Sequence, residues 1–220
     1  LVNRILLPYL NEAGFILEEG IGFERIDKIM LDFGMPMGPF TLMDEIGLDV
    51  GYKVACLLEE NLGARLKVPQ IFKKVYEKKW FGRKTSQGFY IHPALDSKGG
   101  VNRTKEKEPN KEVNGLLPNS LKAVMSDEDI LSRMLYRMIN EAAFCLEEKV
   151  CNEPADVDIG MIMGTGFPPF RGGLLRYADK LGAQRIARES REFADKFKAE
   201  RFSLCGFLVE LAKINGKFYR

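Results

Sequence analysis

The feature that most constrains this chain is an internal repeat, in which one amphipathic pattern occurs twice. Residues 4–19 read RILLPYLNEAGFILEE and residues 133–148 read RMLYRMINEAAFCLEE, with nine of sixteen positions identical at an offset of 129. The apolar residues of both segments recur at spacings of three and four, the period of a helix with one buried face. Two copies of one helical unit, each with an apolar stripe that needs a partner surface, predict a fold in which the copies pack together.

Shorter motifs extend the repeat over most of the chain. The corresponding pairs are Ile26-Asp27 with Val157-Asp158, Gly34-Met35-Pro36 with Gly166-Phe167-Pro168, and Asp44–Gly47 with Asp179–Gly182. Periodicity predicts helices over 4–19, 24–33, 39–61, 68–79, 127–149, 154–163, 171–179, 182–197 and 204–214. Pro8 predicts a kink in the first helix or a helix start near Leu7. The only strand-like segment is Gly88–Ile91, so the predicted class is all-α.

A polar segment separates the two copies. Residues 96–115 contain nine charged residues, and Val101 and Val113 are their only aliphatic or aromatic side chains. Such a stretch buries too little apolar surface to offset the entropy of ordering it, which predicts a mobile, solvated linker. The alternative of a basic tether is weak, because five positive residues face four negative ones. We therefore expect a first helical domain over 1–95, a linker over 96–125 and a second helical domain over 126–220.

Charge and cysteine content exclude several classes of protein. The 33 Lys and Arg residues against 31 Asp and Glu residues leave a net charge of +2, which provides no basic field for nucleic acid. No apolar run is long enough to span a membrane, and no secretory signal is visible. The 4 cysteines lack metal-ligand spacing and are interpreted as reduced thiols in a cytoplasmic protein, or a mitochondrial one in a eukaryote. The chain starts at Leu1, which we interpret as the start of a fragment cut from a longer protein.

Catalytic side chains are few. His92 precedes a proline at the edge of the linker and is predicted to be an exposed loop residue, and no metal site is predicted. Asn11-Glu12 and Asn140-Glu141 lie beside the apolar stripes, so we expect these side chains to accept hydrogen bonds from loop N–H groups. The pairs Glu18-Glu19 and Glu147-Glu148 are predicted to lie on a solvated helix face. From the residues alone, Asn3 is interpreted as a helix N-cap.

Two sets of motifs, considered together, are specific. The first copy carries Val2-Asn3-Arg4, Pro8–Ala13 (PYLNEA), Gly34–Phe40 (GMPMGPF), Asp44–Asp49 (DEIGLD), Gly82-Arg83-Lys84 and Gly88-Phe89-Tyr90. The second carries Asn140-Glu141-Ala142, Gly166–Phe170 (GFPPF), Gly172-Gly173 and Arg176–Asp179 (RYAD). In this combination the first copy resembles the C-terminal part of 3-hydroxyacyl-CoA dehydrogenases. The second resembles the second C-terminal copy of multifunctional β-oxidation enzymes, and only the polar linker lies outside the resemblance.

The resemblance implies a function for the parent protein and a supporting role for this chain. Members of the family oxidise a 3-hydroxyacyl-CoA with NAD, which an upstream Rossmann domain binds, so the chain alone is expected to be inactive and to bind no cofactor. The resemblance implies that Asn3 contributes to the active site and that Met37, Gly38 and Pro39 contact the substrate. Ser132 stands at the position equivalent to Asn3 in the second copy, which argues against a second active site.

The resemblance also implies partners and an arrangement of the copies. Multifunctional relatives carry an enoyl-CoA hydratase domain further upstream, and a thiolase subunit is a further expected partner of the parent. Single-copy relatives dimerise through this helical domain, so the tandem copies are expected to form a pseudo-dimer within one chain. That arrangement avoids an association entropy of about 4–15 kcal/mol. The alternative hypothesis is a non-catalytic helical scaffold or interaction module.

Overall fold

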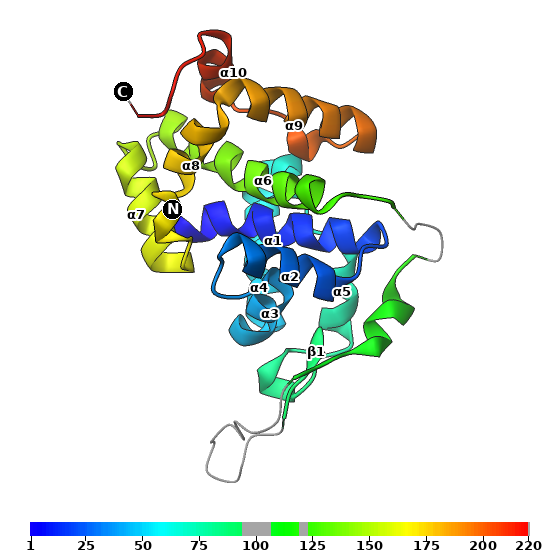
Figure 1. Cartoon of the computed structure of the whole chain (residues 1–220). Helices are drawn as coiled ribbons and strands as arrows, with labels where there is room; N and C mark the ends of the chain where they lie inside the picture. Colours follow the sequence, from blue (N-terminus) through cyan, green and yellow to red (C-terminus); the bar gives the residue numbers. More distant parts are fainter. Residues whose placement is uncertain (94–106, 119–122, 220) are drawn as a thin grey trace.

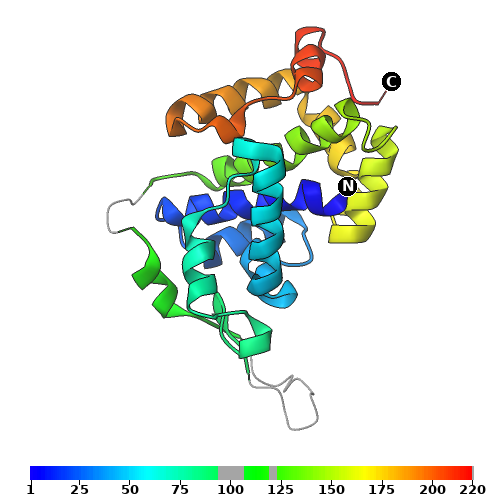
Figure 2. The same cartoon turned by 180° about the vertical axis from the view of Figure 1, so that it is seen from behind.

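The structure, a computed structural model, describes residues 1–93, 107–118 and 123–219 and is built from α-helices (Figures 1 and 2). The first repeat contains α1 (Val2–Glu18), α2 (Phe23–Phe33), α3 (Pro39–Ile46), α4 (Leu48–Leu62), η1 (Gly63–Leu66), α5 (Gln70–Glu77), η2 (Arg83–Thr85) and β1 (Tyr90–Ile91). The strand β2 (Glu108–Pro109) and the helical turn η3 (Lys111–Leu116) follow. The second repeat contains α6 (Asp127–Glu147), α7 (Pro154–Thr165), η4 (Pro169–Arg171), α8 (Leu174–Leu181), α9 (Ala183–Phe197), η5 (Glu200–Phe202) and α10 (Gly206–Lys213). The predicted all-α class is confirmed.

One helix prediction in the first repeat is wrong, and one of the two alternatives predicted at Pro8 is excluded. The segment 39–61 is not one helix, because Gly47 adopts φ +91°, outside the helical region, and separates α3 from α4. Helix α1 does not begin near Leu7 but at Val2, and it continues through Pro8. A proline inside a helix removes one backbone hydrogen bond, so the packing around α1 must compensate for that loss.

Helices α1 and α6 pack against each other at the centre of the molecule, with the remaining helices arranged around them (Figure 1). The buried apolar residues of both repeats form one continuous core. The two Gly/Pro loops also meet: a Cβ on Gly166 would lie 2.7 Å from the ring of Pro36, and one on Gly34 would lie 2.6 Å from the ring of Phe170. The equivalent parts of the two repeats therefore contact each other, as expected for a pseudo-dimer.

Buried ion pairs between the repeats follow the same symmetry. The guanidinium of Arg133 in α6 donates from Nε to Glu12 of α1 at 2.9 Å, and both side chains are fully buried. Its equivalent at an offset of 129, Arg4 of α1, donates from Nε to Glu141 of α6 at 2.7 Å. Each central helix thus supplies a carboxylate and an arginine to the other, which is the pattern of an isologous interface.

A second pair of arginines repeats the exchange from the periphery. Arg201 of η5 donates from Nε to Glu12 at 2.8 Å, while Arg65 of η1 lies 3.8 Å from Glu141. Burial alone raises the pKa of Glu12, but the positive charges of Arg133 and Arg201 outweigh that effect and hold its pKa below the usual value. Glu12 is therefore a buried anion that depends on cations from the other repeat.

Arg137 lies at the pseudo-two-fold axis and breaks the symmetry. Its guanidinium donates to the backbone carbonyls of Arg65 and Arg201, one from each repeat at equivalent places. Burial lowers the pKa of Arg137 to about 10, although the charge of Glu12 opposes the shift. The equivalent residue in α1 is Pro8. One guanidinium satisfies both carbonyls, and a second one in the same place would add an unpaired buried charge.

The expectation of a solvated linker over 96–115 is wrong for its later part. Strand β2 pairs antiparallel with β1, placing Pro109 opposite Tyr90. Asn110 donates from Nδ2 to the carbonyl of Gly88 at 2.8 Å, and Val113 of η3 is fully buried. The polar sequence is ordered because its amides complete the edge of the first repeat and its single valine reaches the core. Residues 94–106 lie outside the described residues.

Candidate functional site

The predicted active-site residue, Asn3, lies in the first turn of α1 and is exposed. Leu1, not Asn3, is the N-cap of α1, so the interpretation of Asn3 as a cap is wrong. Its neighbours are packed: a Cβ on Gly164 of α7 would lie 2.8 Å from the side chain of Val2. The start of α1 is therefore held against α7, while Asn3 is exposed and its side chain makes no hydrogen bond with another described residue.

The C-terminal end of α7 brings the start of α1 close to the Gly/Pro loop of the first repeat. Gly164 contacts Val2, and two residues later Gly166 contacts Pro36. Figure 1 shows the N-terminus beside α7. Asn3 and the loop that contains Met37, Gly38 and Pro39 are thus attached to one short segment of the second repeat. No hydrogen bond joins Asn3 to these loop residues within the part of the chain that the structure describes.

A buried carboxylate, Asp27, holds the loop. It accepts hydrogen bonds from the backbone N–H groups of Phe40 at 2.8 Å and Thr41 at 3.1 Å, at the start of α3, and from the hydroxyl of Tyr90 at 2.8 Å. Asp27 also accepts a hydrogen bond from the hydroxyl of Thr41. Burial raises the pKa of Asp27, although these hydrogen bonds lower it, that from the Thr41 hydroxyl most of all. Gly38 lacks a side chain for a steric reason, because a Cβ there would lie 2.4 Å from the Asp27 Cα.

Substitution of Gly38 tests this packing. We expect Gly38→Ala to lower the free energy of unfolding by about 1–3 kcal/mol, because the added methyl must displace backbone atoms of Asp27. Gly22→Ala is the matched control: Gly22 precedes α2 as Gly38 precedes α3, with φ −60° against −73°, and nothing lies within 4 Å of its Cβ position. Urea denaturation of both variants checks the difference. Equal stability of the two would contradict the close packing of Gly38 on Asp27.

His92 is not the exposed loop residue that its sequence context predicts. It is 5 % exposed, and its Nε2 lies 2.8 Å from a carboxylate oxygen of Asp44. Asp44 is fully buried and also accepts the backbone N–H groups of Phe89 and Tyr90 at 3.0 and 2.9 Å. The histidine is therefore enclosed together with its acidic partner. The Gly88-Phe89-Tyr90 motif thus wraps around a carboxylate.

The buried amides match their predicted role in part. Asn140 accepts a hydrogen bond from the N–H of Cys205 at 2.8 Å and donates to the carbonyl of Ser203 at 2.9 Å. Asn11 donates to the carbonyls of Leu66 and Lys67, but its oxygen has no partner among the described residues. Pro69 stands where the second repeat has Cys205, and proline has no N–H to donate.

The terminal glutamate pairs are more structural than predicted. Glu18 is half-buried and accepts the N–H of Ile71 at 2.6 Å, and burial raises its pKa. Glu19 pairs with Arg133. In the second repeat the side chains are more exposed, but Glu147 accepts the N–H of Phe207 at 2.8 Å. The prediction of a solvated face is therefore wrong for Glu18, which α5 of the same repeat covers, and for Glu19, which Arg133 of the other repeat covers.

A paired motif that was not predicted recurs at these sites. Asp158 accepts the N–H groups of Leu175 and Arg176 and the hydroxyl of Tyr219, as Asp27 does in the first repeat. Asp179 accepts the N–H groups of Phe218 and Tyr219, as Asp44 does for its own Phe-Tyr pair. The signal was present, since Phe89-Tyr90 and Phe218-Tyr219 share the offset of 129 found for the long helices.

The described residues contain one small sheet. Their only sheet is the two-stranded antiparallel pair β1–β2, whereas nucleotide folds place a glycine-rich turn between a parallel strand and a helix. Within residues 1–93, 107–118 and 123–219, no group of three potential metal ligands converges. The four cysteines are free thiols. Among the helices of the described part of the chain, none is long and apolar enough to cross a membrane.

The chain is similar in sequence to proteins of one family. A family model described as 3-hydroxyacyl-CoA dehydrogenase, C-terminal domain, matches residues 1–92 and 130–217. The fatty acid oxidation complex subunit alpha of Shewanella loihica is 42% identical over 218 residues, and that of Vibrio vulnificus is 41% identical. Each match covers 99% of this chain, which spans only 30% and 29% of the length of these relatives.

Solved structures show the same fold. The 3-hydroxybutyryl-CoA dehydrogenase of Escherichia coli superposes with a TM-score of 0.75 at 23% identity, over 98% of this chain and 60% of that one. The dehydrogenase part of multifunctional enzyme 1 from C. elegans gives 0.67 at 27% identity, over 94% of this chain and 46% of that one. Each half of the chain carries one copy of the domain that the family model describes. The chain belongs to the 3-hydroxyacyl-CoA dehydrogenase family, as a tandem pair of its C-terminal domains.

Proposed function

We propose that this chain completes the substrate site, and provides the pseudo-dimer interface, of an NAD-dependent 3-hydroxyacyl-CoA dehydrogenase of fatty acid oxidation. The observation that carries the proposal is the placement of Asn3. Its amide is exposed and makes no capping bond, although the turn that carries it is packed against α7. An exposed amide on a fixed helix turn is suited to orienting a reacting group supplied from outside the chain.

In the proposed division of labour, NAD is held by an upstream Rossmann domain and supplies the acceptor for the hydride. This chain's own part is to position. The amide of Asn3 hydrogen-bonds either the reacting oxygen of the 3-hydroxyacyl-CoA or the catalytic histidine of the upstream domain. Met37, Gly38 and Pro39 contact the substrate: Met37 is half-buried and offers its side chain, while Gly38 and Pro39 are buried and fix the loop.

The partners and compartment follow from the same proposal. The curated relatives are more than three times as long as this chain, which leaves room for the Rossmann domain and for an upstream enoyl-CoA hydratase domain. Their shared name, fatty acid oxidation complex subunit alpha, supports a second subunit as a partner, for which a thiolase is the proposed identity. Free cysteines are typical of a reducing compartment, which supports a cytoplasmic location.

The test is the Asn3→Ala variant of the full-length protein. We expect turnover of 3-hydroxyacyl-CoA to fall about 10²–10³-fold, because a hydrogen bond aimed at the transition state contributes about 2.7–4 kcal/mol. Thermal stability should stay unchanged, since the Asn3 side chain is exposed and caps no helix. Asn61→Ala is the control, because it removes an exposed amide from α4. Wild-type turnover in the Asn3 variant would refute the proposed role.

A further inference from the structure

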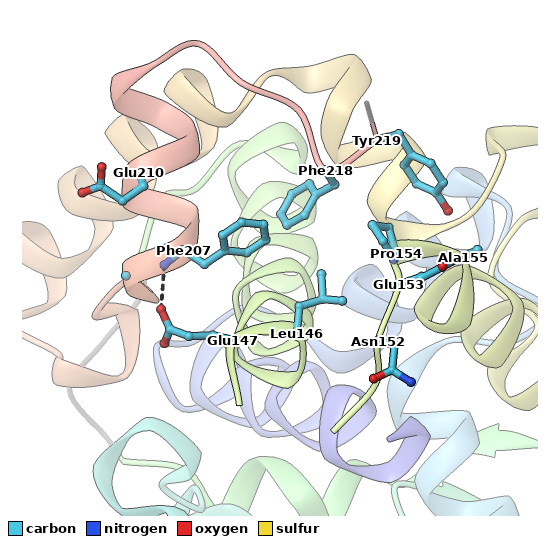
Figure 3. Close-up of a pocket in the computed structure, with 11 residues that line it drawn as sticks. Leu146, Glu147, Asn152, Glu153, Pro154, Ala155, Phe207, Glu210, Phe218 and Tyr219 are labelled. Atoms are coloured by element: carbon cyan, nitrogen blue, oxygen red, sulfur yellow. Dashed lines mark hydrogen bonds between the residues drawn. The ribbon is translucent and has the colours of Figure 1, made fainter. Parts of the chain in front are cut away.

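The second repeat has a large groove that the mechanism does not use. It has a volume of about 1020 Å³ and lies between α10, the end of α6, the start of α7 and the last described residues (Figure 3). Figure 3 shows the rings of Phe207 and Phe218 at its upper side and Leu146 below them. The two rings meet edge to face with centroids 5.8 Å apart. Leu146, Phe207 and Phe218 form the apolar floor of the groove, and they come from α6, α10 and the segment after α10.

The first repeat has the same three positions, but they are closed. Leu17, Ile71 and Phe89 correspond to Leu146, Phe207 and Phe218, as the shared backbone bonds to Glu18 and Glu147 show. Their exposures are 0%, 1% and 0%, whereas in the second repeat Leu146 and Phe207 are half-buried and only Phe218, at 7%, is buried. The repeats thus place equivalent apolar residues at equivalent points, with different covers.

Two parts of the first repeat cover these positions: Phe23, which stands where the second repeat has Pro154 and whose ring centroid lies 6.1 Å from that of Phe89, and a peptide segment, residues 107–118. Its strand β2 pairs with β1, directly after the Phe-Tyr motif, and the N–H of Asn110 donates to the carbonyl of Phe89 at 3.0 Å. Its helical turn η3 packs on α5, where Val113 is fully buried and Lys74 donates to the carbonyl of Leu116 at 2.6 Å. An extended stretch, one aliphatic anchor and a helical turn therefore cover the side of this site that β1 and α5 form.

The rim of the second groove carries the opposite charge. Glu210 of α10 stands at the position of Lys74 in α5 and pairs with Lys213 at 2.6 Å. Glu147, which accepts the N–H of Phe207, and Glu153 also line the groove, so its rim carries three carboxylates against one neighbouring lysine. In the part of the chain that the structure describes, no group donates to the carbonyl oxygens of Lys217 and Phe218, which correspond to those of Gly88 and Phe89. The groove thus offers main-chain acceptors, an apolar floor and negative charge.

We propose that this groove binds a short peptide segment of a partner protein. The segment is extended at its start, inserts one aliphatic side chain between Phe207 and Leu146, and carries lysine or arginine opposite Glu147, Glu153 and Glu210. One backbone N–H of the segment donates to the carbonyl of Phe218 and a side-chain amide donates to that of Lys217, as the N–H and Nδ2 of Asn110 do to Phe89 and Gly88. This is strand-type recognition, in which backbone bonds give affinity and a side-chain pocket gives specificity.

A designed peptide tests the proposal directly. The probe has the sequence of residues 107–118 with Glu108 and Glu112 both replaced by lysine, and it carries a fluorescent label. We expect saturable binding to the full-length protein, measured by fluorescence anisotropy. The same probe with Val113→Asp should lose binding, because its anchor would carry a charge into the apolar floor. Both probes carry the same label, so binding that is lost only with Val113→Asp shows that the groove recognises the aliphatic side chain.

A pair of protein variants locates the site. Glu210→Lys gives the rim the charge of the first repeat and should weaken binding about threefold to fivefold, as expected for an exposed charge pair. Glu192→Lys makes the same charge change on α9 and should leave the affinity unchanged. Both side chains are exposed, so neither variant should affect folding.

Two results would overturn the proposal. One is the absence of saturation up to about 1 mM peptide, which is weaker than specific peptide recognition. The other is concentration-dependent dimerisation that Glu210→Lys abolishes while the peptide fails to bind, since a second copy of the chain would then occupy the groove. Both are independent of the turnover assay of Asn3, so failure here leaves the proposed enzymatic role to its own test.

Discussion

Replacement of Glu12 by leucine is expected to lower the free energy of unfolding by about 3–5 kcal/mol. Glu12 is fully buried and is the shared carboxylate of Arg133 and Arg201, which both come from the other repeat. Without it, Glu19 is the one acidic partner that the buried guanidinium of Arg133 keeps among the described residues. The leftover positive charge, more than the lost attraction, makes this change costly. Urea denaturation of the wild type and the variant measures the difference.

A surface pair provides the control for Glu12. Glu45 pairs with Arg83 at 2.6 Å, but both side chains are partly exposed, so Glu45→Ala should cost only about 0.2–1 kcal/mol. A Glu12→Leu variant that is as stable as Glu45→Ala would show that the buried network contributes little.

Lowering the pH should reduce the contribution of Glu12 to the free energy of unfolding. The folded protein holds the pKa of Glu12 below its usual value of about 4.3, so the carboxylate stabilises the fold fully above that pH. This contribution is lost as the pH falls through the lowered folded pKa. The gap between wild type and Glu12→Leu should therefore narrow only in that acidic window, and a gap that widens there would contradict the assignment.

Replacement of Leu135 by aspartate is expected to open both repeats. Leu135 is 1% exposed in α6, and its apolar surroundings belong to the core that the two repeats share. An unpaired buried charge costs several kcal/mol, and the packing of α6 on α1 should transmit that cost to the first repeat. Amide hydrogen exchange should then show reduced protection over residues 4–60 as well as in the second repeat.

A matched substitution separates this effect from a general effect of charge. Leu57 in α4 is 59% exposed, so Leu57→Asp should change stability by no more than about 0.5 kcal/mol. If Leu135→Asp opens the second repeat but leaves protection over 4–60 unchanged, the repeats fold independently and the pseudo-dimer contributes no stability.

The helices and their pairing could be predicted because their signals are local or repeated. Leu6, Ala13 and Leu17 form an apolar stripe on the first long helix, and Leu135, Ala142 and Leu146 form the corresponding stripe on the second. Two such stripes have few ways to be buried except against each other. The same repeat contained the carboxylates that hold the loops, Asp27 with Asp158 and Asp44 with Asp179. Their roles were missed because a buried aspartate and an exposed one look alike in sequence.

The candidate site was predictable only through resemblance. Asn3 lies near one end of the chain, and nothing in its neighbours distinguishes a helix cap from an exposed amide. The structure assigns Leu1 as the cap and leaves the Asn3 side chain exposed. Met37, Gly38 and Pro39 came from a motif, and only the contact of Gly38 with Asp27 explains why that motif needs a glycine.

The sequence by itself determined the helical class, the two copies and their apolar faces, because these depend on the spacing of residues within short segments. Tertiary structure alone decided that His92 is buried on Asp44, that residues 107–118 are ordered, and that Arg137 binds both repeats. In each case the deciding partner lies about 20 or more residues away along the chain. Burial then changes the free energy of a polar group by several kcal/mol, and periodicity contains no record of which distant carbonyl or carboxylate will meet it.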